Sequence, residues 1–246
     1  MMNDYQAEPG LLDGKIILVT GAGDGIGRVA SQTFAGFGAT VILLGRTVSK
    51  LEAVYDEIVA TGHPEPGIVP MDLTTATGDD VSSLARVIQD RYSRLDGLLH
   101  NAALLGERIP FEHYNLNEWE KVMRVNFSAV VALTQALLPL LKAAKEASVI
   151  FTSSGVGATP RAYWGAYAVS KYALEGFAKL LADELENTSS VRFNILNPGG
   201  TRTAMRAAAY PSEDPSALKT SEDLMPLYLY LMGDDSAAEN GKTFTY

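Results

Sequence analysis

Two kinds of segment alternate along most of the chain. Short runs that are apolar at successive positions are each followed by a longer segment whose apolar residues recur at helical spacing. The apolar runs predict strands at 15–20, 39–45, 67–73, 95–103, 148–154 and 191–199, and the closing GKTFTY is a candidate for one more. The segments between them predict helices near 25–37, 48–61, 79–93, 117–145 and 165–187.

This alternation predicts the fold class. Strands that are apolar on both faces and separated by helices are typical of βαβ units in a parallel sheet that is covered on both sides. We therefore expect an α/β protein with a Rossmann-like, doubly wound, mainly parallel sheet and helices on both faces, in three α/β/α layers.

The connections between these elements are short, and no linker, repeat or low-complexity tract divides the chain. Residues 1–246 are therefore expected to form a single Rossmann-like domain. The segment 200–220 differs from the rest, because it combines two prolines, several charges and an alanine run without a strand period. A long irregular segment after a strand end predicts a substrate lid near 200–220.

Composition and charge exclude several classes of protein. The chain has no cysteine, which removes disulfides and thiolate metal sites and favours the cytosol. A formal net charge of -9 argues against a nucleic-acid partner, and the three scattered histidines lack metal-ligand spacing. The first residues lack the pattern of a signal peptide, and no segment is expected to be long and apolar enough to span a bilayer. We expect a soluble cytoplasmic protein with no metal and no membrane partner.

A glycine-rich turn follows the first predicted strand. The pattern from Thr20 to Gly27 is T-G-x-x-x-G-x-G, in which Ile26 stands where the usual G-x-G-x-x-G dinucleotide motif has its third glycine. Gly21 and Gly25 would allow a tight turn and a close approach of the backbone to a pyrophosphate, at the start of a helix with free N–H groups. A glycine-rich turn without a ligand is the alternative.

Residues at the ends of the next two strands bear on the choice of cofactor. Arg46 favours NADP, because an arginine there accommodates a ribose 2′-phosphate, although Asp24 in the glycine turn is placed to repel the same phosphate. A solvated surface arginine is the alternative. Asp72 and Leu73 are candidates to frame the adenine, with Asp72 accepting from its amine, but Asp72 is equally suited to a turn or a helix cap.

Proton chemistry is suggested by GAYAVSKYALEGF. Tyr167 and Lys171 are four residues apart and share a helix face, where an ammonium and a positive nicotinamide would both favour the phenolate. Ser154 ends a strand and is suited to hydrogen-bond a reacting oxygen. Asn126 lies in a helix, where it either holds a water that links Lys171 to solvent or simply bends or hydrogen-bonds the helix.

Taken together, these motifs resemble the short-chain dehydrogenase/reductase superfamily from near Leu12 to the end of the chain. The matching residues are Thr20-Gly21-x-x-x-Gly25-Ile26-Gly27, His100-Asn101-Ala102-Ala103, Asn126, Ser154, Tyr167-x-x-x-Lys171 and Asn197-Pro198-Gly199. The joint match is far more specific than any single motif. Within the superfamily, the wording of LLGR, FTSSGVG and MPLYLYLMGDD is most similar to the bacterial YciK-like oxidoreductases.

The resemblance implies a sheet of about seven strands, a bound nicotinamide dinucleotide, and homodimers or homotetramers. It also implies Tyr167 as the acid/base, Lys171 on the nicotinamide ribose, Ser154 orienting the substrate and Asn126 in a proton relay. The implied cofactor-binding residues are Gly21, Asp24, Gly25, Ile26, Arg46, Asp72, Leu73, Asn101, Ala102, Tyr167, Lys171, Pro198, Gly199, Thr201 and Thr203. Ala103 departs from the family's usual glycine, and we expect a tolerated variant, strained only if the backbone there needs a positive φ.

The favoured function is an NADP-dependent oxidoreductase, with NAD possible, that interconverts a carbonyl and a secondary alcohol by hydride transfer. The spacing of Tyr167 and Lys171 argues against an enoyl reductase, and the chain is too short for the extended, sugar-modifying relatives. The alternative is a catalytically quiet NADP-binding sensor or scaffold. The substrate stays open, because Arg202, Arg206, Met205 and Tyr210 of the lid suit either an anionic or a large apolar molecule.

Overall fold

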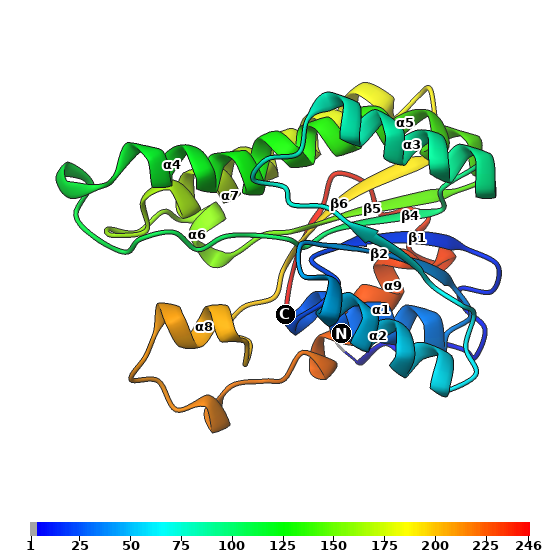
Figure 1. The fold of residues 1–246 in the computed structure, drawn as a ribbon, viewed down its shortest axis with the longest axis horizontal. Helices are drawn as coiled ribbons and strands as arrows, with labels where there is room; N and C mark the ends of the chain where they lie inside the picture. Colours follow the sequence, from blue (N-terminus) through cyan, green and yellow to red (C-terminus); the bar gives the residue numbers. More distant parts are fainter. Residues whose placement is uncertain (1–3) are drawn as a thin grey trace.

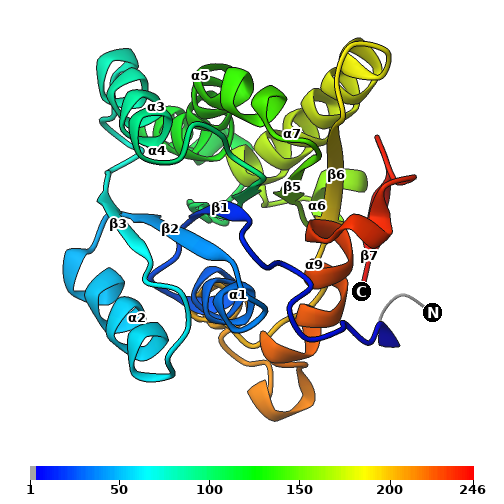
Figure 2. The ribbon, with the colours of Figure 1, turned by 90° about the vertical axis from the view of Figure 1, so that its right-hand side faces the viewer.

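The computed structural model describes residues 4–246, in which a central sheet separates two layers of helices (Figures 1 and 2). The sheet has seven strands, all parallel, in the order β3-β2-β1-β4-β5-β6-β7. Their bounds are β1 Ile16–Thr20, β2 Thr40–Gly45, β3 Gly67–Pro70, β4 Gly97–His100, β5 Ala147–Thr152, β6 Val191–Asn197 and β7 Thr243–Thr245. The predicted doubly wound α/β class and the predicted closing strand are confirmed.

Alternate residues of the central strands contribute to two different cores. Ile16 and Leu18 of β1 belong to the core under the helices α3 Gly78–Tyr92, α5 Ala129–Ala143 and α7 Gly165–Leu185. Ile17 and Val19 belong to the core under α1 Gly25–Gly36, α2 Val48–Ala60 and α9 Met225–Met232. This two-sided burial is why the strands are apolar throughout, and Figure 2 shows the two helix groups on opposite faces.

The chain reverses its direction of winding between β1 and β4, which are neighbours although β2 and β3 lie between them in the sequence. In open parallel sheets this reversal opens a crevice beyond the carboxyl ends of the strands, where ligands bind. The β1–α1 turn, the end of β4 and the end of β5 all reach that edge, and α8 Ala204–Ala209 lies across from them (Figure 1).

Several elements differ from the prediction. β3 and β4 end three residues earlier than expected, at Pro70 and His100. Two short helices, α6 Gly155–Ala158 and α8, were not predicted, and neither was α9. The sequence of α9, MPLYLYLM, is apolar on every side because six of its eight residues are buried. Such a helix has no polar face and hence no helical period to detect.

The helix predicted at 117–145 is one continuous helical run, Leu116–Ala143, made of α4 Leu116–Met123, a π-helical turn Arg124–Ser128 and α5. By length and composition this run meets the criterion for a helix that could cross a membrane, which differs from the expectation of no such segment. Half of its most apolar window is buried inside the protein, and a helix packed in a core meets the same criterion.

Candidate active site

A cavity of about 460 Å³ lies at the carboxyl ends of the strands, between the sheet edge and the segment that contains α8. It is lined by every residue predicted to bind a cofactor, namely Gly21, Asp24, Gly25, Ile26, Arg46, Asp72, Leu73, Asn101, Ala102, Tyr167, Lys171, Pro198, Gly199, Thr201 and Thr203. Ser154 lines it as well, whereas Asn126 does not. The fold therefore brings both halves of the predicted chemistry to one cavity.

The glycine turn has the shape of a close cradle. Gly21 has φ +70° and Gly25 has φ +49°, a region that side chains disfavour. A Cβ atom on Gly27 would stand 2.3 Å from the carbonyl oxygen of Gly21, so only glycine fits there. The helix α1 begins at Gly25, and its first turn lies on the cavity through Gly25 and Ile26. This arrangement fits a pyrophosphate at a helix N-terminus.

Asp24 is paired rather than free to repel an anion. Its carboxylate accepts from the backbone N–H of Gly25 at 2.8 Å, which caps α1, and also from the ammonium of Lys50. The hydrogen bond from Lys50, followed by the backbone bond from Gly25, lowers the pKa of Asp24. Lys50 lines the cavity beside Arg46, and sequence reasoning missed it. The one sequence feature that could have indicated Lys50 is its place four residues after Arg46, in the first turn of α2.

Asp72 takes the turn role that the sequence left open. Its Oδ1 accepts from the backbone N–H of Thr74 at 2.9 Å and from the Thr74 hydroxyl at 2.7 Å, and the pKa of Asp72 is lowered first by these bonds and then by the charge of Arg46. Asp72 and the buried Leu73 nevertheless line the cavity. A role at the adenine therefore remains compatible with the turn.

The residues predicted to transfer protons meet at the opposite end of the cavity. Tyr167 and Lys171 lie on α7, and Ser154 follows β5 and precedes α6. Burial raises the pKa of Tyr167, and a hydrogen bond from Ser154 lowers it only in part. Burial also lowers the pKa of Lys171 to about 8. The expected drop in the tyrosine pKa is thus absent from the protein alone, because the Lys171 ammonium lies 5.7 Å from the Tyr167 ring centre and bonds elsewhere.

Asn126 lies on the π-helical turn, outside the cavity lining. Its Oδ1 accepts from the backbone N–H of Leu104 at 2.7 Å, and its Nδ2 donates to the Leu104 carbonyl at 2.9 Å and to the Ser170 hydroxyl at 3.0 Å. The amide thereby joins the loop after β4 to α7, next to Lys171. The sequence left open whether Asn126 holds a water or forms hydrogen bonds within the protein. These contacts correspond to the second alternative.

The loop after β4 is held against β1. The Thr20 hydroxyl accepts from the backbone N–H groups of Asn101 at 3.0 Å and Ala102 at 3.1 Å. Within residues 4–246, the non-glycine residues with positive φ are Ser93 and Tyr163. The backbone at Ala103 therefore carries no such strain, and the departure from the family's glycine is accommodated.

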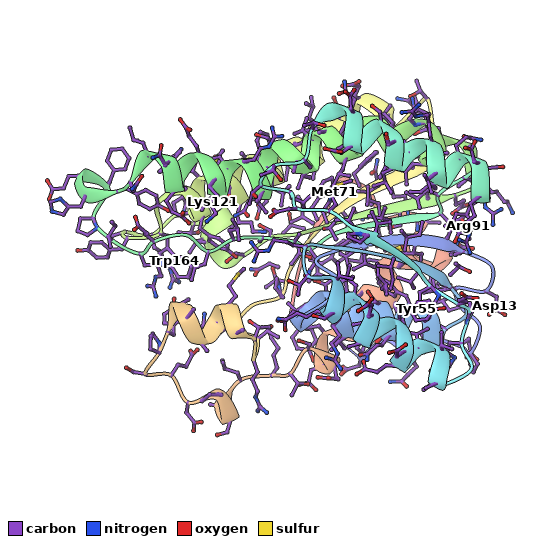
Figure 3. The ribbon with its side chains drawn as sticks, in the orientation of Figure 1. Asp13, Tyr55, Met71, Arg91, Lys121 and Trp164 are labelled. Atoms are coloured by element: carbon purple, nitrogen blue, oxygen red, sulfur yellow. The ribbon has the colours of Figure 1, made fainter. Side chains whose placement is uncertain are left out.

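The remaining predicted residues lie at the start of the segment that is predicted to be a lid. Gly199 has φ +63°, and the Thr201 hydroxyl donates to the Pro198 carbonyl at 3.0 Å. The Thr203 hydroxyl accepts from the backbone N–H of Arg206 at 3.1 Å and so caps α8. Sequence reasoning missed Trp164, which lines the cavity beside Tyr167 and is marked in Figure 3 together with Met71, another lining residue.

A parallel sheet with this strand order, a glycine cradle and a Ser/Tyr/Lys cluster at one cavity define a dinucleotide-binding α/β protein. The short chain dehydrogenase family model matches residues 15–214. The chain is 53% identical over 240 residues to the uncharacterised oxidoreductase YciK of Escherichia coli K12, covering 98% of this chain and 94% of that protein. The chain therefore belongs to the short chain dehydrogenase family and is an oxidoreductase.

Solved structures show the same likeness. A short chain dehydrogenase from Pseudomonas syringae has a TM-score of 0.97 and 51% identity, with 98% of each chain covered. A short chain dehydrogenase from Shigella flexneri 2a, solved in complex with NADP, has a TM-score of 0.94 and 53% identity, covering 97% of this chain and 99% of that one.

Proposed function

We propose that this protein is an NADP(H)-dependent oxidoreductase that interconverts a carbonyl and a secondary alcohol by hydride transfer. The observation that carries the proposal is the single cavity, which has a glycine cradle with two cations at one end and Ser154, Tyr167 and Lys171 at the other. Each end alone has other uses. Together they fit a cofactor whose phosphates and nicotinamide lie far apart.

The cofactor preference rests on Arg46 and Lys50, which line the same part of the cavity. A 2′-phosphate adds negative charge at the adenosine ribose, and two cations near it stabilise that charge. Asp24 opposes this less than a free carboxylate would, because Lys50 pairs with it. The NADP complex of the Shigella flexneri relative supports the same choice. NAD is a possible but weaker ligand in this proposal.

In the reduction, the bound NADPH supplies a hydride to the carbonyl carbon. Tyr167 donates its proton to the carbonyl oxygen, and the Ser154 hydroxyl hydrogen-bonds the same oxygen. The raised pKa of Tyr167 keeps the phenol protonated at neutral pH, which suits its role as an acid. Lys171 would hold the nicotinamide ribose, and Asn126 would support the proton relay by holding the loop after β4 and α7 in place beside Lys171.

The proposal includes self-association and a cytoplasmic location. Self-association is supported by Val169, Tyr172 and Leu180 of α7, which are apolar or aromatic and exposed. The small-molecule partner is a carbonyl or alcohol substrate. We also propose that residues 200–220 act as its lid, since α8 within them forms one wall of the cavity.

The test is NADPH oxidation by the wild type and by Tyr167→Phe across a panel of ketones, aldehydes and quinones. Phenylalanine keeps the buried ring but removes the proton, so turnover is expected to fall by roughly 10²–10⁴-fold. NADPH affinity, measured by calorimetry, should change little. A quiet sensor or scaffold would bind NADPH tightly and oxidise it with no member of the panel, and full activity of Tyr167→Phe would remove the proposed acid.

A further inference from the structure

The cavity beyond Tyr167 has an apolar wall. Leu104, Leu105, Trp164, Met205 and Ala209 all line it there. Trp164, Tyr167 and Ala209 belong to one buried cluster, and Leu105 and Met205 pack against that cluster. These residues come from the loop after β4, the start of α7 and α8, so the wall spans the body of the protein and the lid segment.

Trp164 is held in place by its own turn. Tyr163 before it has φ +71°, and Gly165 after it has φ +39°. A Cβ atom on Gly165 would stand 2.3 Å from the Tyr114 ring, so glycine is required for the chain to pass. Behind Trp164, the Arg108 guanidinium lies 4.4 Å from its ring centre and 4.8 Å from that of Tyr210. The indole is therefore a preformed part of the wall.

Arg202 and Arg206, which the sequence offered as anion ligands, hydrogen-bond to other residues of the lid segment. Arg202 donates to the backbone carbonyls of Pro215 at 2.7 Å, Leu218 at 3.2 Å and Ser216 at 3.4 Å. It does not line the cavity at Tyr167 but fastens the outer loop of the segment. Its role is thus explained without a ligand.

Arg206 lines the cavity but carries its own counter-ion. Its Nε and Nη2 donate to the two carboxylate oxygens of Glu213, both at 2.6 Å, and its guanidinium lies 3.8 Å from the Tyr210 ring centre. Such a two-bond pair is the strongest arrangement for an arginine and a carboxylate. An incoming carboxylate would have to displace Glu213 to use Arg206.

The other cations on the cavity are also accounted for. Arg46 and Lys50 lie at the opposite, cofactor end, and Lys171 donates to the Thr152 carbonyl at 2.7 Å. A charged group placed against Leu105, Trp164 and Met205 would lose its hydration without gaining a partner, which disfavours its binding. An apolar group there would instead gain by leaving water.

We propose that the substrate is an uncharged carbonyl compound whose aromatic or bulky apolar group packs against Trp164, Leu105 and Met205. This inference rests on the proposed function and resolves the choice between an anionic and an apolar substrate. In the reduction, a hydride from NADPH forms the new C–H bond, the carbonyl π electrons take the Tyr167 proton, and NADP⁺ and the alcohol leave. Solvent then returns a proton to Tyr167, so charge and electrons balance.

Binding is measured separately from turnover by the fluorescence of Trp164. The chain has two tryptophans, and Trp119 packs on Tyr114 and Phe111 outside the cavity lining, so Trp119→Phe leaves Trp164 as the sole reporter. This variant is saturated with NADP⁺ and titrated separately with three ketones. Acetophenone is the neutral aromatic probe, 4-acetylbenzoate is the same molecule with an added carboxylate, and acetone is a ketone without the aromatic ring. Free tryptophan corrects for light absorbed by the probes.

Acetophenone should quench Trp164 saturably and bind at least about tenfold more tightly than 4-acetylbenzoate or acetone. In the wild-type background, Trp164→Ala should remove that preference while Trp164→Phe keeps most of it, as calorimetry will report. Arg206→Gln should leave the preference unchanged. Tighter binding of 4-acetylbenzoate that Arg206→Gln abolishes would overturn the inference, as would no binding by either aromatic probe.

The same titration separates this inference from the proposed function. If acetophenone binds with the expected preference but NADPH is not oxidised by any carbonyl, the apolar site stands and the oxidoreductase proposal fails. If carbonyls are reduced but anionic ones have the higher kcat/KM, the enzyme stands and the apolar substrate class is wrong.

Discussion

The Lys171 ammonium donates a hydrogen bond to the backbone carbonyl of Thr152 at 2.7 Å. Lys171 is 3% exposed and Thr152 is 6% exposed, so the contact is closed to solvent. It places the lysine charge at the end of β5 rather than against the Tyr167 hydroxyl. This explains why burial, and not the lysine, dominates the pKa of Tyr167 in the protein alone.

The buried lysine predicts a specific pH dependence of folding. Burial lowers its pKa from 10.5 in water to about 8. Below pH 8 both the folded and unfolded states carry the charge, and the folded state bears a burial penalty of about 3 kcal/mol. Between pH 8 and 10.5 the folded state releases its proton first, so stability rises with pH through that window.

Lys171→Met isolates this effect, because it keeps the length of the side chain and removes the titration from both states. The free energy of unfolding of the wild type minus that of Lys171→Met should increase by about 3 kcal/mol from pH 7.5 to pH 10.5. Urea denaturation at fixed ionic strength measures it. A difference that stays constant over the window would mean that Lys171 titrates at its ordinary pKa.

The Asp24–Lys50 pair predicts how cofactor preference is set. Arg46→Ala and Lys50→Ala should each weaken NADP binding by roughly tenfold or more and leave NAD little changed, because each removes a cation near the 2′-phosphate. Asp24→Asn should instead strengthen NADP binding. Asparagine keeps the helix cap, while the Lys50 ammonium loses the carboxylate that competes with the 2′-phosphate for it.

Calorimetric titration of NADP and NAD against these three variants decides the matter. Equal affinity for both cofactors in the wild type would contradict the assignment of Arg46 as a partner of the 2′-phosphate. Weaker NADP binding in Asp24→Asn would mean that the aspartate positions Lys50 rather than competing for it. Lys15→Ala is a matched control, because Lys15 pairs with Asp234 and lies outside the cavity lining.

The lid proposal predicts a change in hydrogen exchange. Amides from Met205 to Leu218 should exchange more slowly with NADP and substrate bound than in the protein alone, as the segment closes over the cavity. Arg108 donates to the Ala209 carbonyl and lies against the rings of both Trp164 and Tyr210, so Arg108→Gln should speed exchange in the ligand-free protein.

Arg86→Gln is the control for the lid, because Arg86 is exposed on α3 and, within residues 4–246, hydrogen-bonds to the nearby Ser83. It should leave exchange from Met205 to Leu218 unchanged. Equal exchange of that segment in the free, NADP-bound and ternary states would mean that it is an ordinary surface loop and not a ligand-gated lid.

Local pattern and tertiary contact explain which features the sequence could predict. The strands, five long helices and the residues at strand ends follow from apolar periodicity and from the rule that ligands bind at the carboxyl edge. The π-helical turn at Asn126 and the Asp24–Lys50 pair depend on contacts between elements. Burial, which raises the pKa of Tyr167 in the protein alone, cannot be read from its neighbours in sequence, and the predicted lowering by Lys171 and a positive nicotinamide stays a prediction for the cofactor-bound protein.

Trp164 illustrates the same limit at the substrate end. A tryptophan before a helix has no signal for a cavity wall, and its place follows from the positive φ of Tyr163 and from the Arg108 guanidinium behind it. The roles of Arg202 and Arg206 also needed the structure, since only the contacts with the lid backbone and Glu213 show that both arginines are engaged.

Self-association through α7 is the remaining prediction. Val169, Tyr172 and Leu180 are 45%, 62% and 56% exposed, and their spacing places them along one side of the helix. A symmetric contact of this face with its copy would bury it, so the wild type should sediment as a dimer or tetramer at micromolar concentration. Tyr172→Glu with Leu180→Glu should dissociate it, because two carboxylates would be buried without partners.

Val87→Glu, at a 60% exposed site on α3, is the control and should leave the assembly intact. A wild type that sediments as a monomer, or a double variant that stays assembled, would count decisively against this interface.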